Sequence, residues 1–180
     1  MERSIIIAGS GGQGILFFGR MLASAGMLEG RNVTWFPSYG AEMRGGTANC
    51  TVIISDEMIG SPVVMIPDIL IVMNRASLDR FLPKLRNKGL LFYDSSLINV
   101  KTPGKGITAV PVPATAMAGE LGSPKSANMV LLGAFIAKSG ILRKSSVFSM
   151  FEDTADPLRG GASRINTALI QKGMDFIENS

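Results

Sequence analysis

The chain has 180 residues, of which 46% are hydrophobic, and its charged side chains give a formal net charge of +4. This length predicts one domain over residues 1–180, with enough apolar content to bury roughly 70% of the unfolded surface. The chain has no histidine, and Cys50 is its single cysteine. These facts exclude an imidazole base, a histidine metal site, an internal disulfide and an iron–sulfur cluster held by this chain alone.

The distribution of charge and apolar residues argues against two classes of partner. Lysines and arginines are scattered singly or in pairs, such as Lys84 with Arg86, without the clustering of a nucleic-acid face. Apolar runs fall short of the ~20 residues of a membrane span, and glycines at 9–14 interrupt the start of the chain too early for a signal peptide. We expect a cytoplasmic protein that binds neither nucleic acid nor membrane.

The first half of the chain predicts strands interrupted by one long helix. An apolar strand at 4–8 leads through glycines into a helix at 15–28, which Gly30 closes. Strands follow at 33–36 and 47–55, and Asp56-Glu57 predicts a turn into a hairpin partner at 58–60. The nearly continuous apolar run at 68–73 indicates a strand that is covered on both faces.

The second half alternates strands with helices and then becomes helical. A helical stripe over 78–85 is kinked or split at Pro83, and strands follow at 90–94 and 107–112. Helices are expected at 115–121 and 128–137, from a cap at Ser145 or Ser146 through 151, and at 163–177. This order predicts an α/β fold: a three-layer α/β/α domain with a mostly parallel, Rossmann-like sheet and one antiparallel hairpin.

A glycine-rich loop joins the first strand to the first helix. Its candidate contacts for an anion or a partner chain are Gly9, Gly11, Gly12, Gln13 and Gly14. The spacing has the form of a dinucleotide fingerprint, because glycines and helix N–H groups accept a phosphate. That fingerprint also needs an acid at the end of the second strand, where this chain ends in Trp-Phe-Pro-Ser. We therefore favour a tight turn without a dinucleotide, in which Gln13 contacts a partner chain or another ligand.

The loop at 37–47 is the most informative stretch of the chain. It carries the candidate ligand or interface residues Ser38, Tyr39, Glu42, Arg44, Gly45 and Gly46. Glu42 and Arg44 could pair with each other, or Arg44 could hold a carboxylate or phosphate with Tyr39 as a hydrogen-bond donor. The spacing leaves both alternatives open, and no catalytic residue or metal ligand is assigned.

Three further polar or reactive residues have simpler interpretations. Asp94, at the end of a buried strand, is expected to cap the following turn, although such strand ends also form binding crevices. Asn128 is expected to be a helix N-cap. Cys50, among apolar neighbours in a strand, is expected to be an inert core thiol.

Together the two glycine-containing loops resemble those of the small gamma-type subunit of the 2-oxoacid:ferredoxin oxidoreductases. Further similarities are Ser61-Pro62, Pro67-Asp68, Met73-Asn74, Asp94-Ser95-Ser96 and the stretch from Asn128-Met129 to Leu132-Gly133. The loop sequence Pro-Ser-Tyr-Gly-x-Glu-Met-Arg-Gly-Gly is similar to that of family members that use 2-oxoglutarate or branched-chain 2-oxoacids. One departure is Gly122-Ser123, where members often have Gly-Asn, and it puts one local contact in doubt.

The resemblance implies a non-autonomous subunit of an enzyme that joins a 2-oxoacid to coenzyme A, releases carbon dioxide and reduces ferredoxin. It implies no cofactor in this chain, with thiamine diphosphate, Mg and [4Fe-4S] clusters on alpha, beta and ferredoxin-like delta partner subunits. The competing readings are a free-standing Rossmann-like oxidoreductase that uses NAD(P) and a non-catalytic scaffolding domain. The molecules that co-purify with the chain would separate the three.

Overall fold

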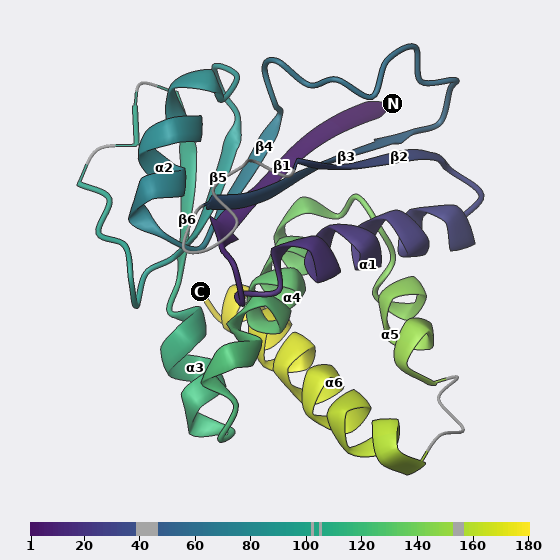
Figure 1. Ribbon diagram of the computed structural model, residues 1–180, viewed down its shortest axis with the longest axis vertical. Helices are drawn as coiled ribbons and strands as arrows, with labels where there is room; N and C mark the ends of the chain where they lie inside the picture. The colour runs from purple at the N-terminus through teal and green to yellow at the C-terminus, as the bar shows by residue number, and fades with distance from the viewer. Residues whose placement is uncertain (39–46, 102, 105, 153–156) are drawn as a thin grey trace.

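The computed structural model describes residues 1–38, 47–101, 103–104, 106–152 and 157–180, which build one six-stranded sheet flanked by helices (Figure 1). The strands stand in the order β2-β3-β1-β4-β5-β6. Strands β1, β4, β5 and β6 are parallel, while β3 runs antiparallel to both of its neighbours. Their bounds are β1 Glu2–Ser10, β2 Asn32–Ser38, β3 Thr47–Ser55, β4 Ile69–Val72, β5 Leu90–Asp94 and β6 Thr108–Val112.

The helices fall largely where apolar periodicity predicts them. They are α1 Ile15–Leu28, α2 Arg75–Phe81, α3 Ala114–Glu120, α4 Ala127–Ser139, α5 Lys144–Glu152 and α6 Pro157–Glu178. Pro83 splits the predicted stripe, because α2 ends at Phe81 and a 3₁₀ turn follows over Leu82–Lys84. The cap predicted at Ser145 or Ser146 is wrong, since α5 already begins at Lys144. Helix α6 starts earlier than expected, with a proline at its first position, where no backbone N–H is needed.

The domain has the predicted three layers, and the hydrophobic core on one side of the sheet is larger than the core on the other side. On one side of the sheet α2 buries Leu78 and Phe81 against alternate residues of the parallel strands, such as Ile6 and Leu70. On the other side α1, α4 and α6 build the larger core (Figure 1). Strand β4 is buried at all four positions, as its unbroken apolar run indicates. We call these two faces the α2 side and the α1 side.

The hairpin predicted between 47–55 and 58–60 is wrong. Residues 58–60 form no strand, and β3 is instead hydrogen-bonded along one edge to β1 and along the other to β2. Both edges of the strand are therefore already paired, which leaves no place for a third partner. The antiparallel hairpin of this fold is β2–β3, and its connection contains residues 39–46, which lie outside the described part of the chain.

Two glycines set the distance between α4 and α6. A Cβ atom on Gly133 of α4 would lie only 1.9 Å from the carbonyl oxygen of Ile170, whereas real Cβ atoms essentially never come closer than 3.0 Å to such an atom. A Cβ atom on Gly173 of α6 would do the same to the carbonyl oxygen of Val130. The two helix backbones thus touch at reciprocal positions. Because residues 127–136 of α4 are buried, this contact lies at the centre of the larger core.

Candidate functional site

The candidate site lies at the carboxyl ends of β1 and β4. The chain leaves β1 through the glycine loop towards α1 on one side of the sheet, and it leaves β4 towards α2 on the other side. Adjacent parallel strands whose connections diverge in this way form the crevice where open α/β sheets bind ligands. The crevice brings together the loop at 10–14 and the pair Met73-Asn74.

Gln13 spans this crevice with its side chain. Its Oε1 accepts a hydrogen bond of 2.7 Å from the backbone N–H of Ser10, and its Nε2 donates one of 3.0 Å to the carbonyl oxygen of Met73. A Cβ atom on Gly9 would lie only 2.7 Å from Gln13 Oε1, so the loop closes over the amide because position 9 has no side chain. Both polar ends of Gln13 therefore serve the domain itself.

Asn74 links the same crevice to α2. Its Nδ2 donates a 2.6 Å hydrogen bond to Ser10 Oγ, and its Oδ1 caps α2 by accepting a 2.7 Å hydrogen bond from the backbone N–H of Ser77. An asparagine directly before a helix is a strong N-cap signal, so its capping role was readable from the sequence. Its bond to Ser10 was not, because the two residues meet only through the pairing of β1 with β4.

Asn128 holds the glycine loop from the side of α4. Its expected role as an N-cap is wrong, because α4 begins at Ala127 with Ser126 in the cap position. The buried Asn128 amide instead donates a 3.2 Å hydrogen bond to the carbonyl oxygen of Gly14. Gly14 has φ +70, and a Cβ atom there would overlap Asn128 Nδ2. Position 14 therefore requires glycine for two reasons, its positive φ and the lack of space for a Cβ atom.

These contacts explain the glycine spacing without a dinucleotide. Gly9 makes room for Gln13, Gly14 makes room for Asn128, and Gly12 adopts φ +88 at the exposed tip. The Gln13 amide occupies the interior of the loop, and β2 ends at Ser38 rather than at an acid. Gly11 and Gly12 are exposed, so an anion or partner contact at the loop tip stays a prediction.

The second predicted loop is described only at its two ends. Ser38 closes β2 and is exposed, and Thr47 opens β3. The candidate residues Tyr39, Glu42, Arg44, Gly45 and Gly46 lie outside the described residues. From α2, Arg80 Nη1 donates a 3.0 Å hydrogen bond to Thr47 Oγ1, a contact that the sequence did not predict. The loop thus begins at the end of the edge strand β2 and ends at the start of β3, where Arg80 of α2 reaches Thr47.

Asp94 fulfils the structural role expected of it. Its buried carboxylate accepts hydrogen bonds from the N–H groups of Ser96 and Thr115, at 3.0 Å and 3.3 Å, and a 2.5 Å bond from Thr115 Oγ1. These bonds join the end of β5 to the start of α3. The donors come from the turn after β5 and from the first turn of α3, so we assign Asp94 to the scaffold beside the crevice.

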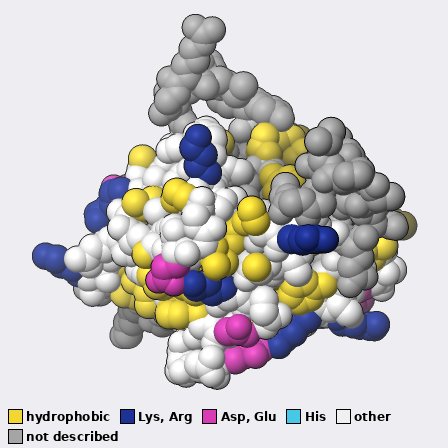
Figure 2. Space-filling model, turned by 90° about the horizontal axis from the view of Figure 1, so that it is seen from below, with side chains coloured by type: hydrophobic (Ala, Val, Ile, Leu, Met, Phe, Trp, Pro, Cys, Tyr) yellow, Lys and Arg dark blue, Asp and Glu magenta, His cyan; other side chains and the backbone are white. Residues whose placement is uncertain are grey.

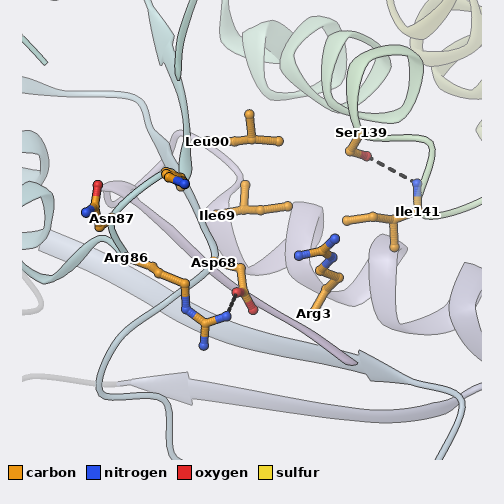
Figure 3. A pocket seen from close by; sticks show the side chains of 10 residues that line it. Arg3, Asp68, Ile69, Arg86, Asn87, Leu90, Ser139 and Ile141 are labelled. Carbon is orange, nitrogen blue, oxygen red and sulfur yellow. Dashed lines mark hydrogen bonds and ion pairs between the residues drawn. The ribbon is translucent and has the colours of Figure 1, made fainter. Parts of the chain in front are cut away.

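A hollow of about 360 Å³ opens at the opposite, amino-terminal ends of the strands (Figure 3). Ile69, Leu90 and Ile141 line it, and Arg86 pairs there with Asp68 at 2.5 Å. Asp68 also accepts hydrogen bonds from Ser4, at 2.9 Å from the backbone N–H and 2.8 Å from the hydroxyl. The acid of this hollow is therefore held by structural bonds.

Cys50 is the inert core thiol that the sequence predicts. It is fully buried in β3 against α1, where a Cβ atom on Gly19 would lie 2.5 Å from its sulfur. Burial raises the pKa of the Cys50 thiol to about 12, since the thiolate would lose its hydration, and hydrogen bonds from Trp35 and Gly19 offset only part of this rise. At neutral pH the thiol is protonated and unreactive.

This shift predicts a loss of stability in alkaline solution. In the unfolded chain Cys50 ionises near its ordinary pKa of about 9, whereas the folded chain keeps its proton up to about 12. As the pH rises through this window the unfolded state is stabilised, by up to about 1.4 kcal/mol per pH unit. Urea unfolding between pH 8 and 10.5 should show this slope, and Cys50→Ala should lack that component. Equal slopes in the two proteins would contradict the assignment.

The described part of the chain holds neither a helix fit to cross a membrane nor a group of metal ligands. No described helix combines the length and the apolar character needed to cross a membrane. Within the same part of the chain, no three His, Cys, Asp or Glu side chains gather as metal ligands. On the face shown in Figure 2, lysine and arginine side chains are spread over the surface, and some of them lie beside acidic side chains.

Comparison with known proteins identifies what the chain resembles. The family model described as pyruvate ferredoxin/flavodoxin oxidoreductase matches residues 4–176. The 2-oxoglutarate synthase subunit KorC of Methanocaldococcus jannaschii is 33% identical, over 97% of this chain and 94% of that protein. The ketoisovalerate oxidoreductase subunit VorA of Methanothermobacter thermautotrophicus is 43% identical over 76% of this chain. The matched stretch makes up 28% of the length of VorA. A keto/oxoacid ferredoxin oxidoreductase gamma subunit from Geobacter sulfurreducens has the same fold, with a TM-score of 0.83 and 27% identity over 99% of both chains.

Proposed function

The chain belongs to the pyruvate ferredoxin/flavodoxin oxidoreductase family, and from this premise we propose that it is the gamma-type subunit of a heteromeric 2-oxoacid:ferredoxin oxidoreductase. The observation that carries the proposal is the family match over residues 4–176, together with the similarity to KorC over nearly the whole of both chains. The complex would convert a 2-oxoacid and coenzyme A into an acyl-CoA and carbon dioxide, and the electrons would pass to ferredoxin. The proposal includes a cytoplasmic location.

We propose 2-oxoglutarate or a branched-chain 2-oxoacid as the substrate. Relatives named for 2-oxoglutarate and for ketoisovalerate both match the chain. The loop at 37–47 has a sequence typical of the family members that use these two classes of substrate. Within the domain, no described residue of the crevice separates a dicarboxylic from a branched aliphatic substrate.

The chemistry of this chain supports a division of labour among subunits. A [4Fe-4S] cluster needs four ligands, usually cysteine thiolates, whereas this chain has one cysteine, and that thiol is buried in the core. The residues present do not fit a cluster, so we place the clusters, with thiamine diphosphate and Mg, on alpha, beta and ferredoxin-like delta partners. An NAD(P)-dependent oxidoreductase is not favoured, because β2 ends at Ser38 and not at the acid that would hold the ribose hydroxyl.

The chain alone should be catalytically silent, because it lacks the groups that form the acyl intermediate and carry electrons. The test is CoA-dependent viologen reduction with 2-oxoglutarate and with 3-methyl-2-oxobutanoate. It is run on the isolated chain and on the complex reconstituted with its partner subunits. We expect turnover in the complex and none in the isolated chain. Activity of the isolated chain, or a complex that turns over equally well without it, would refute the proposal.

The loop at 37–47 is proposed to meet a partner subunit or an anionic ligand through Arg44. We expect Arg44→Ala to lower turnover or assembly of the complex at least tenfold and to leave the stability of the free chain nearly unchanged. A surface ion pair with Glu42 predicts only about 0–1 kcal/mol and no effect on turnover. A buried pair within the domain predicts a loss of about 3–5 kcal/mol in the free chain.

The matched control for this variant is Arg143→Ala, which removes an exposed arginine next to α5. It should leave both turnover and stability as they are in the unmodified chain. If Arg44→Ala behaves like this control in both measurements, the loop has no role in assembly or ligand binding.

A further inference from the structure

The hollow at the amino-terminal ends of the strands is lined by more basic than acidic side chains (Figure 3). Its volume of about 360 Å³ lies within the ~300–1,000 Å³ that is usual for small-molecule sites. Arg3, Arg86 and Lys88 contribute three positive charges, and Asp68 contributes the one negative charge among these lining residues. Three positive charges against one negative charge leave an excess of two, which favours an anion.

Two oxygen-bearing groups that would repel an anion are already bound within the domain. The Asp68 carboxylate accepts hydrogen bonds from Ser4 and pairs with Arg86. At the rim, the carbonyl oxygen of Ile141, which follows α4, accepts a 3.2 Å hydrogen bond from Arg31 Nη1. Because an arginine offsets the negative charge on each of these groups, they oppose an incoming anion less than unpaired oxygens would.

Two of the three basic side chains are available to a ligand. No hydrogen bond or ion pair joins the side chain of Arg3 or of Lys88 to another described residue. Figure 3 shows the Arg3 side chain extending into the hollow between Asp68 and Ile141. A guanidinium group binds a phosphate or a carboxylate through two parallel hydrogen bonds, whereas an ammonium group acts as a point charge. Arg3 therefore suits the orientation of an anion, and Lys88 suits its attraction.

The backbone of Lys88 has a conformation that lysine disfavours. Its φ is +64, and in the described part of the chain it is the one residue other than glycine with a positive φ. The turn around it is closed by a 2.8 Å hydrogen bond from the N–H of Gly89 to the carbonyl oxygen of Arg86. Glycine adopts this left-handed conformation freely, whereas a residue with a Cβ atom adopts it at a cost in stability. Such strain is often found where a side chain serves a function, here by placing an ammonium group at the hollow.

The size and the remaining lining of the hollow define the class of ligand. A water molecule takes up ~30 Å³ of the liquid, so about 360 Å³ corresponds to roughly a dozen non-hydrogen atoms. A phosphate monoester carries close to two negative charges at neutral pH, which matches the excess of positive charge. The uncharged part of the lining is apolar at three positions and polar at two: Ile69, Leu90, Ile141, Asn87 and Ser139. It suits a short carbon chain that bears hydroxyl groups.

We propose that this hollow binds a small organic phosphate monoester, with Arg3 and Lys88 as the groups that contact the phosphate. The site lies at the opposite ends of the strands from the crevice between β1 and β4. It is therefore a second site of the domain, and the inference goes beyond the proposed function without depending on it.

The test is a calorimetric titration of the full chain with glycerol 3-phosphate at constant ionic strength. We expect binding, and Arg3→Gln and Lys88→Gly should each weaken it at least about tenfold, as expected for the loss of one charged hydrogen bond. Lys88→Gly should not lower the melting temperature, because glycine adopts the left-handed backbone without strain. The matched control is Lys125→Gln, which removes an exposed cation at the other end of α4, about 20 Å from Ser139. This control should leave the affinity unchanged.

Three results would overturn the proposal. The first is that the unmodified chain does not bind glycerol 3-phosphate at millimolar concentrations. The second is that Lys125→Gln weakens binding as much as Arg3→Gln and Lys88→Gly do, which would indicate attraction to the net charge of the chain and not a site. The third is that succinate, a dicarboxylate of similar size, binds as tightly as the phosphate monoester, which would refute the assignment to phosphate.

Discussion

Replacing Gly133 by alanine should lower the free energy of unfolding by about 3 kcal/mol or more, the upper end of the range for overpacked cores. The added methyl group would overlap the backbone carbonyl of Ile170, and a backbone cannot move aside as a long side chain can. Helices α4 and α6 would have to separate at the centre of the larger core. The same change at Gly173, which faces the carbonyl of Val130, should cost a similar amount. Urea unfolding of each variant measures the effect.

Gly119→Ala provides the matched control. Gly119 also lies in a helix, α3, but a Cβ atom there would meet nothing within 4 Å. Alanine is favoured over glycine in helices, so this variant should gain about 0.5–1 kcal/mol. If Gly133→Ala were as stable as Gly119→Ala, the close approach of α4 to α6 would be contradicted.

The second large effect is expected at Asp94. Alanine at this position would leave the N–H groups of Ser96 and Thr115 and the Thr115 hydroxyl without their buried acceptor, at a cost of about 3–4 kcal/mol. Asparagine should cost only about 1–2 kcal/mol, because its oxygen can still accept from both N–H groups and its amide can donate to the Thr115 hydroxyl. The ratio of the two losses distinguishes a hydrogen-bonding role from mere packing.

These free energies are measured by urea unfolding at neutral pH on the isolated chain. Thr115→Val removes one of the three donors and should cost less than Asp94→Ala. Asp94→Ala and Asp94→Asn that destabilise the chain equally would show that the loss comes from the charge or from packing, and would contradict the hydrogen-bonding account.

Local patterns in the sequence predicted those parts of the fold that depend on neighbours along the chain. The unbroken apolar run at 69–72 indicated a strand buried on both faces, and Pro83 marked the end of α2. Glycine spacing at 9–14 indicated a turn between strand and helix. In each case the responsible force acts within a few residues, so one sequence is enough to reveal it.

Features that depend on pairing across the sheet were not readable in this way. The pattern of β3 was right, but its partners β1 and β2 both precede it in the chain, so a turn at Asp56-Glu57 was mistaken for a hairpin. Asn128 was taken for a cap, because nothing local shows that α4 brings its amide to Gly14. Gln13 was expected to face a partner or ligand, whereas the adjacent strand β4 supplies the acceptor for its amide.

The position of β1 has a consequence for how the chain is made. Strand β1 precedes both of its partners along the chain and lies between them in the sheet, with Ile5 opposite Val52 on one edge and Ile69 on the other. Both edges of this apolar strand lack a partner until β3 has been made, and one edge lacks a partner until β4 has been made; unpaired apolar edges are open to aggregation. Because β3 and β4 are distant from β1 in sequence, folding must close long loops before β1 is paired, and such non-local pairing slows folding. The edges of β1 are therefore protected only after both β3 and β4 have been made.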